Sequence, residues 1–256
     1  AYEILNRDWS SDVCSSDLMT MNGKYKTGMV KTPEELLKIS KASAMGDKCY
    51  EHILTFVTPG MTEIEVTEEI EKTFLSYGAE GLSFPTICVS GVNTMHPHGE
   101  PSDKKIEKGD FVTIDMGAVV EGYCGDMTRT FAMGSVTAKM AEIYDVVLSA
   151  QTAALNACRA GVRCFDIDKI ARDIINQAGY GEYYIHGTGH GVGKDVHEAP
   201  TLNSKSDEIL EENMPVTVEP GIYIPDEFGV RIEDLAIITD FGIINTVKSP
   251  KELMIL

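Results

Sequence analysis

Val112-Thr113-Ile114-Asp115-Met116-Gly117 and Val216-Thr217-Val218-Glu219-Pro220-Gly221 are two versions of one strand-like hexapeptide, and they decide the fold. The copies lie 104 positions apart, and both have a carboxylate at the fourth place and a glycine at the sixth. The residues that precede them, 106–111 and 210–215, also correspond. Self-similarity at a fixed, long period predicts a duplicated fold in which each half builds the same acid-bearing strand.

The duplication extends upstream of both strands. Two segments 101 positions apart have apolar residues at every fourth position, which is the period of one buried helix face. These residues are Val66, Ile70 and Phe74 in the first segment and Ile167, Ala171 and Ile175 in the second. Gly78 and Gly179 follow them as candidate C-caps. Each half is therefore predicted to run helix, helix, strands, and the interleaved repeat predicts one joint α+β domain.

The composition limits the class of partner. The chain has 256 residues and a formal net charge of -18, which argues against nucleic acid or an anionic membrane as the main partner. No apolar run approaches the roughly 18 to 20 residues that span a bilayer, and no signal-like apolar segment opens the chain. The six cysteines show no Cys-x-x-Cys spacing, which predicts reduced, mostly buried thiols. A cytoplasmic protein is the resulting expectation.

The N-terminus differs from the rest of the chain. Residues 1–18 lack both hydrophobic periods, contain the single Trp, and closely resemble a translated sequencing adapter fused in frame. We therefore predict that residues 1–18 are non-native and leave them out of the fold reasoning. Residues 19–29 are expected to form a leader or linker, and residues 30–256 the folded domain.

The first acid-bearing strand is predicted to belong to a hairpin. Residues 111–132 contain two strand-like runs on either side of Glu121-Gly122, a candidate two-residue turn. With that turn, paired positions sum to 243, so Asp115 lies opposite Thr128 and Asp126 lies opposite Gly117. Asp115 and Asp126 then become diagonal neighbours on one face of the sheet.

The second half supplies an equivalent pair of acids, Glu219 and Glu233. Four carboxylates at a shared, partly buried site cannot all stay ionised without cations. Two divalent ions would balance their four negative charges and clamp a bridging water. His190 is the expected nitrogen ligand, because the glycines around it in 186–193 let the backbone bring an imidazole close. A nucleotide-binding loop there fails on glycine spacing.

With these residues in place, the chain from about Val30 to Leu256 resembles the metallopeptidases of the pita-bread (creatinase/aminopeptidase) fold. The resemblance implies two pseudo-symmetric halves around an antiparallel curved sheet. It implies two divalent metal ions, with manganese favoured over cobalt, iron or zinc. It also implies five metal ligands at the positions already argued from the repeat: Asp115, Asp126, His190, Glu219 and Glu233.

Two unrepeated positions favour the Xaa-Pro peptidase branch of that family, which includes Xaa-Pro aminopeptidases and Xaa-Pro dipeptidases (prolidases). His186 stands four residues before the ligand His190, and Arg231 stands two before the ligand Glu233. Methionine aminopeptidases match His98 and His197 but typically lack these two. Xaa-Pro peptidases usually have an additional N-terminal domain, and this chain has room for only some 20 residues before the catalytic domain. That departure either keeps a methionine aminopeptidase open as the alternative or indicates a truncated gene, and the adapter-like start favours truncation. A non-catalytic pita-bread binding protein is less expected, because all five ligands are present.

The resemblance also implies roles in catalysis. A hydroxide held between the two metals would attack the scissile carbonyl of a peptide with proline after the scissile bond. Glu219 would pass the proton to the leaving nitrogen, and His98 and His197 would assist catalysis. His98, His186, His197 and Arg231 would bind substrate. Oligomeric state stays open, a homodimer included.

Overall fold

Each half of the chain begins with two helices, and in the first half capping residues in the sequence mark where both helices start. In the first half these are α2 (Pro33–Phe56) and α3 (Glu63–Ser76), each opened by a capping box, Thr32 with Glu35 and Thr62 with Glu65. The computed structural model describes residues 28–256. The predicted adapter-derived segment 1–18, and residues 19–27 of the predicted leader, lie outside the described residues.

The second half repeats this arrangement with α4 (Ala138–Ala157) and α5 (Cys164–Gln177). The predicted one-faced burial is confirmed, because all six residues of the two periodic segments are fully buried. Gly78 and Gly179 follow the ends of α3 and α5 with φ of 90° and 87°, a left-handed conformation that glycine adopts without strain. The helix, helix, strands order of each half is thus confirmed.

The strands are short and split between the halves. In the first half they are β1 (Gly81–Leu82), β2 (Ile87–Ser90), β3 (Phe111–Met116), β4 (Ala118–Val120), β5 (Tyr123–Cys124) and β6 (Met127–Ala132). In the second half they are β7 (Gly189–Gly191), β8 (Glu198–Leu202), β9 (Pro215–Val218), β10 (Gly221–Ile224), β11 (Phe228–Arg231), β12 (Asp234–Thr239) and β13 (Gly242–Asn245). Short 3-10 turns, η1 (Gly91–Met95) and η2 (Gly181–Tyr183), complete the elements.

The predicted hairpin register is confirmed. Val120 pairs with Tyr123, and Asp115 pairs with Thr128, so paired positions sum to 243 throughout. Glu121 and Gly122 have φ of 50° and 76°, the two positive values that a tight hairpin turn requires. Asp115 therefore lies where the repeat analysis put it, near the end of a buried strand.

The named strands pair in an antiparallel sense, but the sheet is interrupted where the acids lie. The ladder of β3 with β6 stops at Met116 and resumes in β4 with β5 beyond Gly117. A Cβ on Gly117 would come within 2.0 Å of the Gly125 carbonyl oxygen, so the two strands approach too closely there for side chains. In the second half Glu219-Pro220 separates β9 from β10. Asp126 and Glu219 lie at these interruptions, and Asp115 is paired in β3 one residue before its end.

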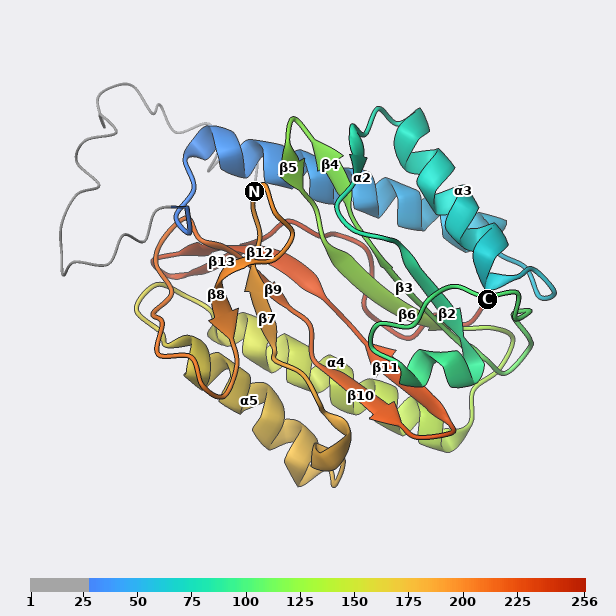
Figure 1. Cartoon of the computed structure of the whole chain (residues 1–256). Coiled ribbons are helices and arrows are strands. Elements are labelled where there is room, and N and C mark those ends of the chain that lie inside the picture. Colours follow the sequence, from blue (N-terminus) through green and yellow to red (C-terminus); the bar gives the residue numbers. More distant parts are fainter. Residues whose placement is uncertain (1–27) are drawn as a thin grey trace.

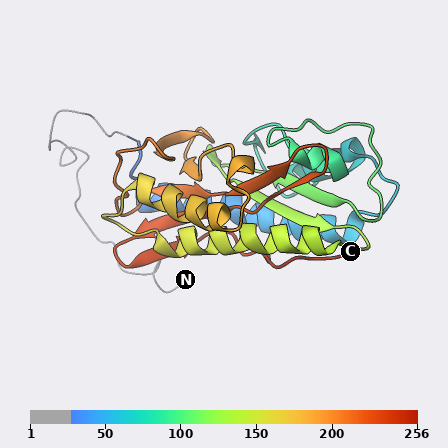
Figure 2. The same ribbon diagram turned by 90° about the horizontal axis from the view of Figure 1, so that it is seen from below.

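The strands occupy the middle of the molecule in Figure 1, with α2 and α3 along one edge and α4 and α5 along the other. Figure 2, seen from below, shows α4 and α5 side by side against the strands. Two hydrophobic clusters follow the two halves, one built around α2, α3 and β3 and the other around α4, α5 and β9. In residues 28–256 no helix combines the length and apolar character needed to cross a bilayer. The five described cysteines are buried, as predicted, and Cys49, Cys88, Cys124 and Cys158 are free.

Candidate metal centre

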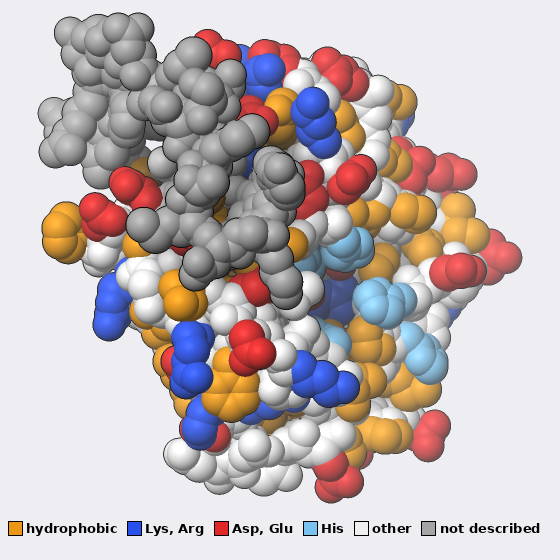
Figure 3. Space-filling view, turned by 60° about the vertical axis from the view of Figure 1, so that its left-hand side comes forward, with side chains coloured by type: hydrophobic (Ala, Val, Ile, Leu, Met, Phe, Trp, Pro, Cys, Tyr) orange, Lys and Arg blue, Asp and Glu red, His pale blue; other side chains and the backbone are white. Residues whose placement is uncertain are grey.

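A cavity of about 490 Å³ opens between the two halves, and every site residue that the sequence analysis singled out lines it. Figure 3 shows histidine side chains gathered on one face of the molecule, close to acidic and basic groups. The nine predicted residues in the cavity wall are His98, Asp115, Asp126, His186, His190, His197, Glu219, Arg231 and Glu233. Because they come from both halves, the cavity depends on how the halves pack.

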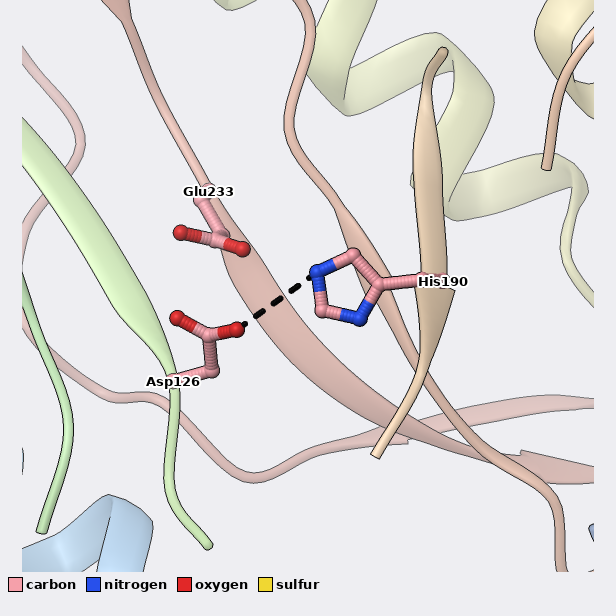
Figure 4. Close-up of side chains that lie close together, drawn as sticks. All are labelled: Asp126, His190 and Glu233. Atoms are coloured by element: carbon pink, nitrogen blue, oxygen red, sulfur yellow. Dashed lines mark ion pairs between the residues drawn. The ribbon is translucent and has the colours of Figure 1, made fainter. Parts of the chain in front are cut away.

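Three of these side chains form a tight cluster. Ligand atoms of Asp126, His190 and Glu233 all lie within 4.8 Å of one another. Asp126 precedes β6, His190 lies in β7, and Glu233 lies between β11 and β12. Figure 4 shows the three side chains pointing towards one another, with Asp126 Oδ2 at 3.6 Å from His190 Nε2. One imidazole and two carboxylates from three separate elements can hold a divalent ion.

The remaining two predicted ligands flank this cluster. Glu219 Oε1 lies 3.3 Å from His190 Nε2, so Glu219 reaches the cluster from the end of β9. Asp115 lies outside the three-residue cluster, because its Oδ2 accepts a 2.7 Å hydrogen bond from Arg231 Nη2. Its other oxygen, Oδ1, is buried and has no hydrogen-bond partner. A buried carboxylate oxygen without a partner is costly, and a cation at this position would satisfy it.

The electrostatics favour cations in the same place. Burial raises the pKa of Asp126 well above its usual range, and the charges of Glu233, Asp115 and Glu219 raise it further. Burial, followed by the charges of Glu219 and Asp115, does the same to the pKa of Glu233. Burial also raises the pKa of Asp115, against the opposing charge of Arg231. The raised pKa values reflect burial and the mutual repulsion of the acids, which cations would relieve, so the donor set fits two divalent ions.

The imidazole of His190 is oriented for coordination. Its Nδ1–H donates to the Gly191 carbonyl oxygen at 3.0 Å, which turns Nε2 towards the carboxylates. Burial acts to lower the pKa of His190, but the contacts with Glu219, the Gly191 carbonyl and the charge of Asp115 together raise it. Burial acts to raise the pKa of Glu219, but the contact with His190 and the charges of His186 and Arg231 together lower it. The pKa of Glu219 is thus shifted in the opposite direction from those of the other three acids.

The glycines beside His190 allow the strand to approach its neighbours. A Cβ on Gly189 would lie 2.0 Å from the Thr217 carbonyl oxygen, and one on Gly191 would lie 2.3 Å from the Ala199 carbonyl oxygen. The close approach is to the backbone of β8 and β9, and the prediction that these glycines bring the imidazole near metal ions stays a prediction. His190 N–H also donates to Thr217 Oγ1 at 3.1 Å, which fixes the register of β7.

His186 and Arg231 are joined by a residue that the sequence analysis missed, Tyr223. Arg231 Nη1 donates to the Tyr223 hydroxyl oxygen at 3.0 Å, and that hydroxyl lies 2.8 Å from His186 Nε2. His186 Nδ1–H donates to the Gly187 carbonyl oxygen at 2.7 Å, so Nε2 accepts the Tyr223 proton. Burial lowers the pKa of His186. The imidazole is therefore a neutral acceptor whose two nitrogens are both engaged.

His98 and His197 take equivalent places in the two halves. Each begins a His-x-x-Pro sequence, and each lines the cavity. The His197 ring lies edge-on to the His190 ring at 4.4 Å between centroids. Burial, followed by the neighbouring charge of His190, lowers the pKa of His197. The lowered pKa keeps that ring neutral, able to donate from one nitrogen and accept at the other.

Two further residues behind the acids were not foreseen. Thr128 Oγ1 donates to Glu233 Oε2 at 2.6 Å, and Arg129 donates to the Glu233 backbone carbonyl. Arg129 also forms a buried ion pair of 2.7 Å with Asp234. Successive residues of an extended chain face opposite sides, so Glu233 points into the cavity while Asp234 points into the core. The adjacent acids at 233–234 were the available signal for this second role.

Comparison with known proteins gives a consistent result. A model of metallopeptidase family M24 matches residues 37–240. The Xaa-Pro dipeptidase of Pyrococcus furiosus is 44% identical over 226 residues, which cover 88% of this chain and 65% of that protein. A solved structure of an Xaa-Pro dipeptidase from Bacillus anthracis has a TM-score of 0.88 at 49% identity and covers 89% of this chain and 64% of its own.

An X-Pro aminopeptidase from Thermotoga maritima is also similar, with a TM-score of 0.87 at 38% identity over 89% of this chain and 64% of its own. These similarities confirm the predicted pita-bread fold. The chain spans about 65% of the length of the curated relatives, just under two thirds.

Proposed function

The chain belongs to metallopeptidase family M24, and from this premise we propose that it is a dinuclear-metal peptidase that hydrolyses Xaa-Pro bonds. The observation that carries the proposal is the cavity that gathers five candidate ligands from both halves next to His186 and Arg231. The similar structures described as Xaa-Pro dipeptidase and X-Pro aminopeptidase support the choice of proline.

Two divalent ions would be held by the five-residue set Asp115, Asp126, His190, Glu219 and Glu233. Mostly oxygen donors with one imidazole suit manganese, and cobalt, iron or zinc are alternatives. When bound, such ions lower the pKa of a water and polarise a carbonyl oxygen. The unpartnered oxygen of Asp115 and the raised pKa values of Asp126 and Glu233 support this assignment.

Glu219 is proposed to carry the proton that hydrolysis requires. Addition of water across the scissile bond puts a hydroxyl on the carbonyl carbon and a proton on the leaving nitrogen. An amine leaves the tetrahedral intermediate much more readily than an amide anion, so this proton must reach the proline nitrogen before it leaves. Glu219 faces the cavity beside His190, and its lowered pKa favours the carboxylate form, which is the form that can accept the proton from water. Passing that proton to the leaving nitrogen restores the carboxylate.

The auxiliary residues are proposed to bind the peptide and its reacting carbonyl. His98 and His197 reach the cavity from opposite halves and can donate to the oxygen that becomes negatively charged. Arg231 is hydrogen-bonded to Asp115 and Tyr223, so its guanidinium is held in place and is proposed to orient the residues of the pocket wall. His186, whose nitrogens are both engaged, contributes through its ring face and its hold on Tyr223.

The test compares three substrates in the presence of manganese and of cobalt: an Xaa-Pro dipeptide, an Xaa-Pro-Xaa peptide and a Met-Ala peptide. We expect cleavage of the bond before proline. Cleavage of the Met-Ala peptide alone would establish the alternative, a methionine aminopeptidase. Absence of any cleavage, with no transition metal retained after reconstitution, would favour a non-catalytic binding protein.

Glu219→Gln tests the proton role. The variant should lose about 10²- to 10⁴-fold in kcat, the range expected when a general acid–base group is removed. Glu227→Gln is the matched control, because Glu227 is exposed and pairs with Lys139 outside the cavity. Metal content measured in both variants separates loss of proton transfer from loss of ions. Full turnover by Glu219→Gln with metal bound would contradict the assignment.

The remaining assignments follow from the same function. We propose residues 30–256 as the catalytic domain, which contains the family match at 37–240. Peptides are the proposed substrates and nucleic acid is not a proposed partner, in keeping with the net charge of -18. A cytoplasmic location is proposed, supported by the free thiols of Cys49, Cys88, Cys124 and Cys158. A homodimer is proposed for the oligomeric state, and light scattering would test it.

A further inference from the structure

Glu63, the first residue of α3, has a fully buried carboxylate that holds one loop. Oε1 accepts from Ser90 N–H at 2.6 Å, from Ser90 Oγ at 2.9 Å and from Asn93 Nδ2 at 3.1 Å. Oε2 accepts from Asn93 Nδ2 at 3.1 Å, from Ser102 N–H at 3.1 Å and from Ser102 Oγ at 2.7 Å. All six hydrogen bonds come from residues 90–102, so one side chain joins both ends of that loop.

All of these donors are neutral, so none of them brings a positive charge to the buried carboxylate, which depends on its hydrogen bonds. A buried carboxylate is tolerated only when its oxygens are hydrogen-bonded, and bonds to an ionised acceptor are stronger than bonds between neutral groups. The position at the start of α3 adds the favourable field of a helix N-terminus. The hydrogen bonds of the carboxylate exist only while Ser90, Asn93 and Ser102 are in place. Displacing the loop would therefore leave a buried carboxylate without donors.

The loop carries the first-half histidine of the cavity. Residues Pro97, His98, Gly99, Glu100 and Pro101 all line the cavity wall. The middle of the loop is fixed from the opposite half, where Arg231 Nη1 donates to the Pro97 carbonyl oxygen at 3.0 Å. The loop that contains His98 is therefore fixed at two places: Glu63 holds both of its ends, and Arg231 holds its centre.

The second half has a matching anchor on its own second helix. Asp168 in α5 is buried, and its Oδ1 accepts from Thr188 N–H at 3.1 Å and Thr188 Oγ1 at 2.8 Å. Its partner Arg172 donates to the backbone carbonyls of Tyr184 and His186. In both halves a buried acid on the second helix holds the segment that brings a histidine to the cavity. Because both halves use a buried acid in this way, we infer that the anchoring serves the site and is not only a feature of local packing in one half.

We propose that Glu63 is a positioning residue for His98, and that it sets how well the first-half wall of the cavity orients the peptide. The proposal rests on the Xaa-Pro peptidase function proposed above. Glu63 touches neither metal ligands nor cavity, so its effect must travel through the 90–102 loop.

The experiment compares Glu63→Gln with Glu65→Gln. Both replace a carboxylate by an amide in the first turn of α3, but Glu65 caps the helix at Thr62 and makes no bond to the loop. The amide at position 63 turns an NH₂ group towards donors of the loop. We expect kcat/KM of Glu63→Gln on an Xaa-Pro peptide to fall about ten- to a hundredfold, as for a slightly misplaced catalytic group. Metal content should stay at the wild-type level, and Glu65→Gln should keep wild-type kcat/KM.

Two further measurements identify the route. In a His98→Ala background, Glu63→Gln should produce no further loss of kcat/KM, because the residue through which it acts is gone. Hydrogen exchange of the amides at 91–101 should accelerate in Glu63→Gln and stay unchanged in Glu65→Gln. Ser102→Ala, which removes one donor of the same anchor, should reproduce a smaller part of both effects and serves if Glu63→Gln does not fold.

An equal loss of kcat/KM with and without His98, or unaltered exchange at 91–101, would overturn the proposal. The exchange measurement needs no substrate. If the wild-type protein cleaved no Xaa-Pro peptide, the proposed function would be refuted. Hydrogen exchange at 91–101 would still show whether Glu63 anchors the loop.

Discussion

Arg231→Lys keeps the positive charge at position 231 but removes the guanidinium, so it tests whether the hydrogen-bond geometry of that group matters beyond its charge. The guanidinium donates four side-chain hydrogen bonds: to Thr128 Oγ1 at 3.1 Å, to the Pro97 carbonyl and the Tyr223 hydroxyl at 3.0 Å each, and to Asp115 Oδ2 at 2.7 Å. A lysine ammonium is a compact charge and can reach only one or two of these partners. Losing two or three bonds at about 1 kcal/mol each, more for the charged one, lowers the free energy of unfolding by about 2–4 kcal/mol.

Urea denaturation of the metal-free protein measures that loss. Arg163→Lys is the control, because Arg163 makes two similar bonds to Asp166 on the surface, where such a pair contributes about 0–1 kcal/mol. Activity should fall as well, by about tenfold or more in kcat/KM, since Pro97 and Tyr223 lose their common anchor. Equal stabilities of the two lysine variants, together with wild-type kcat/KM for Arg231→Lys, would refute the role given to the guanidinium.

Two other predictions concern the acids and the glycines. Burial raises the pKa of Asp126 and Glu233 in the metal-free protein, so the folded state binds protons more tightly than the unfolded chain, and the free energy of unfolding should fall as pH rises from about 4.5 towards neutrality. Urea titrations at several pH values should show this slope, which the Asp126→Asn/Glu233→Gln variant and bound manganese should each reduce; a slope that bound metal and the double variant leave unchanged would contradict it. Gly189→Ala forces a Cβ against a backbone oxygen at 2.0 Å and should cost about 1–3 kcal/mol or more and weaken metal binding, whereas Gly81→Ala, with nothing within 4 Å, should stay within about 0.5 kcal/mol. Calorimetric metal titration and thermal unfolding of the two alanine variants would check this, and equal behaviour of both would count against the close strand approach.

The features predicted well from the sequence are those that local patterns control. The period of Val66, Ile70 and Phe74 predicted a buried face because a helix repeats its side every three to four residues. The Glu121-Gly122 turn predicted the hairpin register because a two-residue loop leaves only one pairing. The shared places of Asp115 and Glu219 in the repeat predicted that acids from both halves converge. Each of these inferences needs only neighbours in the chain or the internal repeat.

The features that were missed depend on contacts between distant segments. Tyr223 joins His186 to Arg231, and Glu63 holds the His98 loop, yet no spacing in the sequence relates these residues. The direct contact of Arg231 with Asp115 was also not foreseen, because it crosses from one half to the other. Side-chain partners of this kind follow from packing and not from periodicity. The missed residues therefore lie behind the predicted ones, where they orient side chains that face the cavity.

The division of the candidate ligands between the two halves gives the metal supply a second consequence. Asp115 and Asp126 belong to the first half, while His190, Glu219 and Glu233 belong to the second. Ions bound by both sets stabilise the docked arrangement over any opened one by mass action. Proteolysis of a protein in the cell follows the population of opened forms. Removal of metal would thus be expected to make the protein more susceptible to proteolysis.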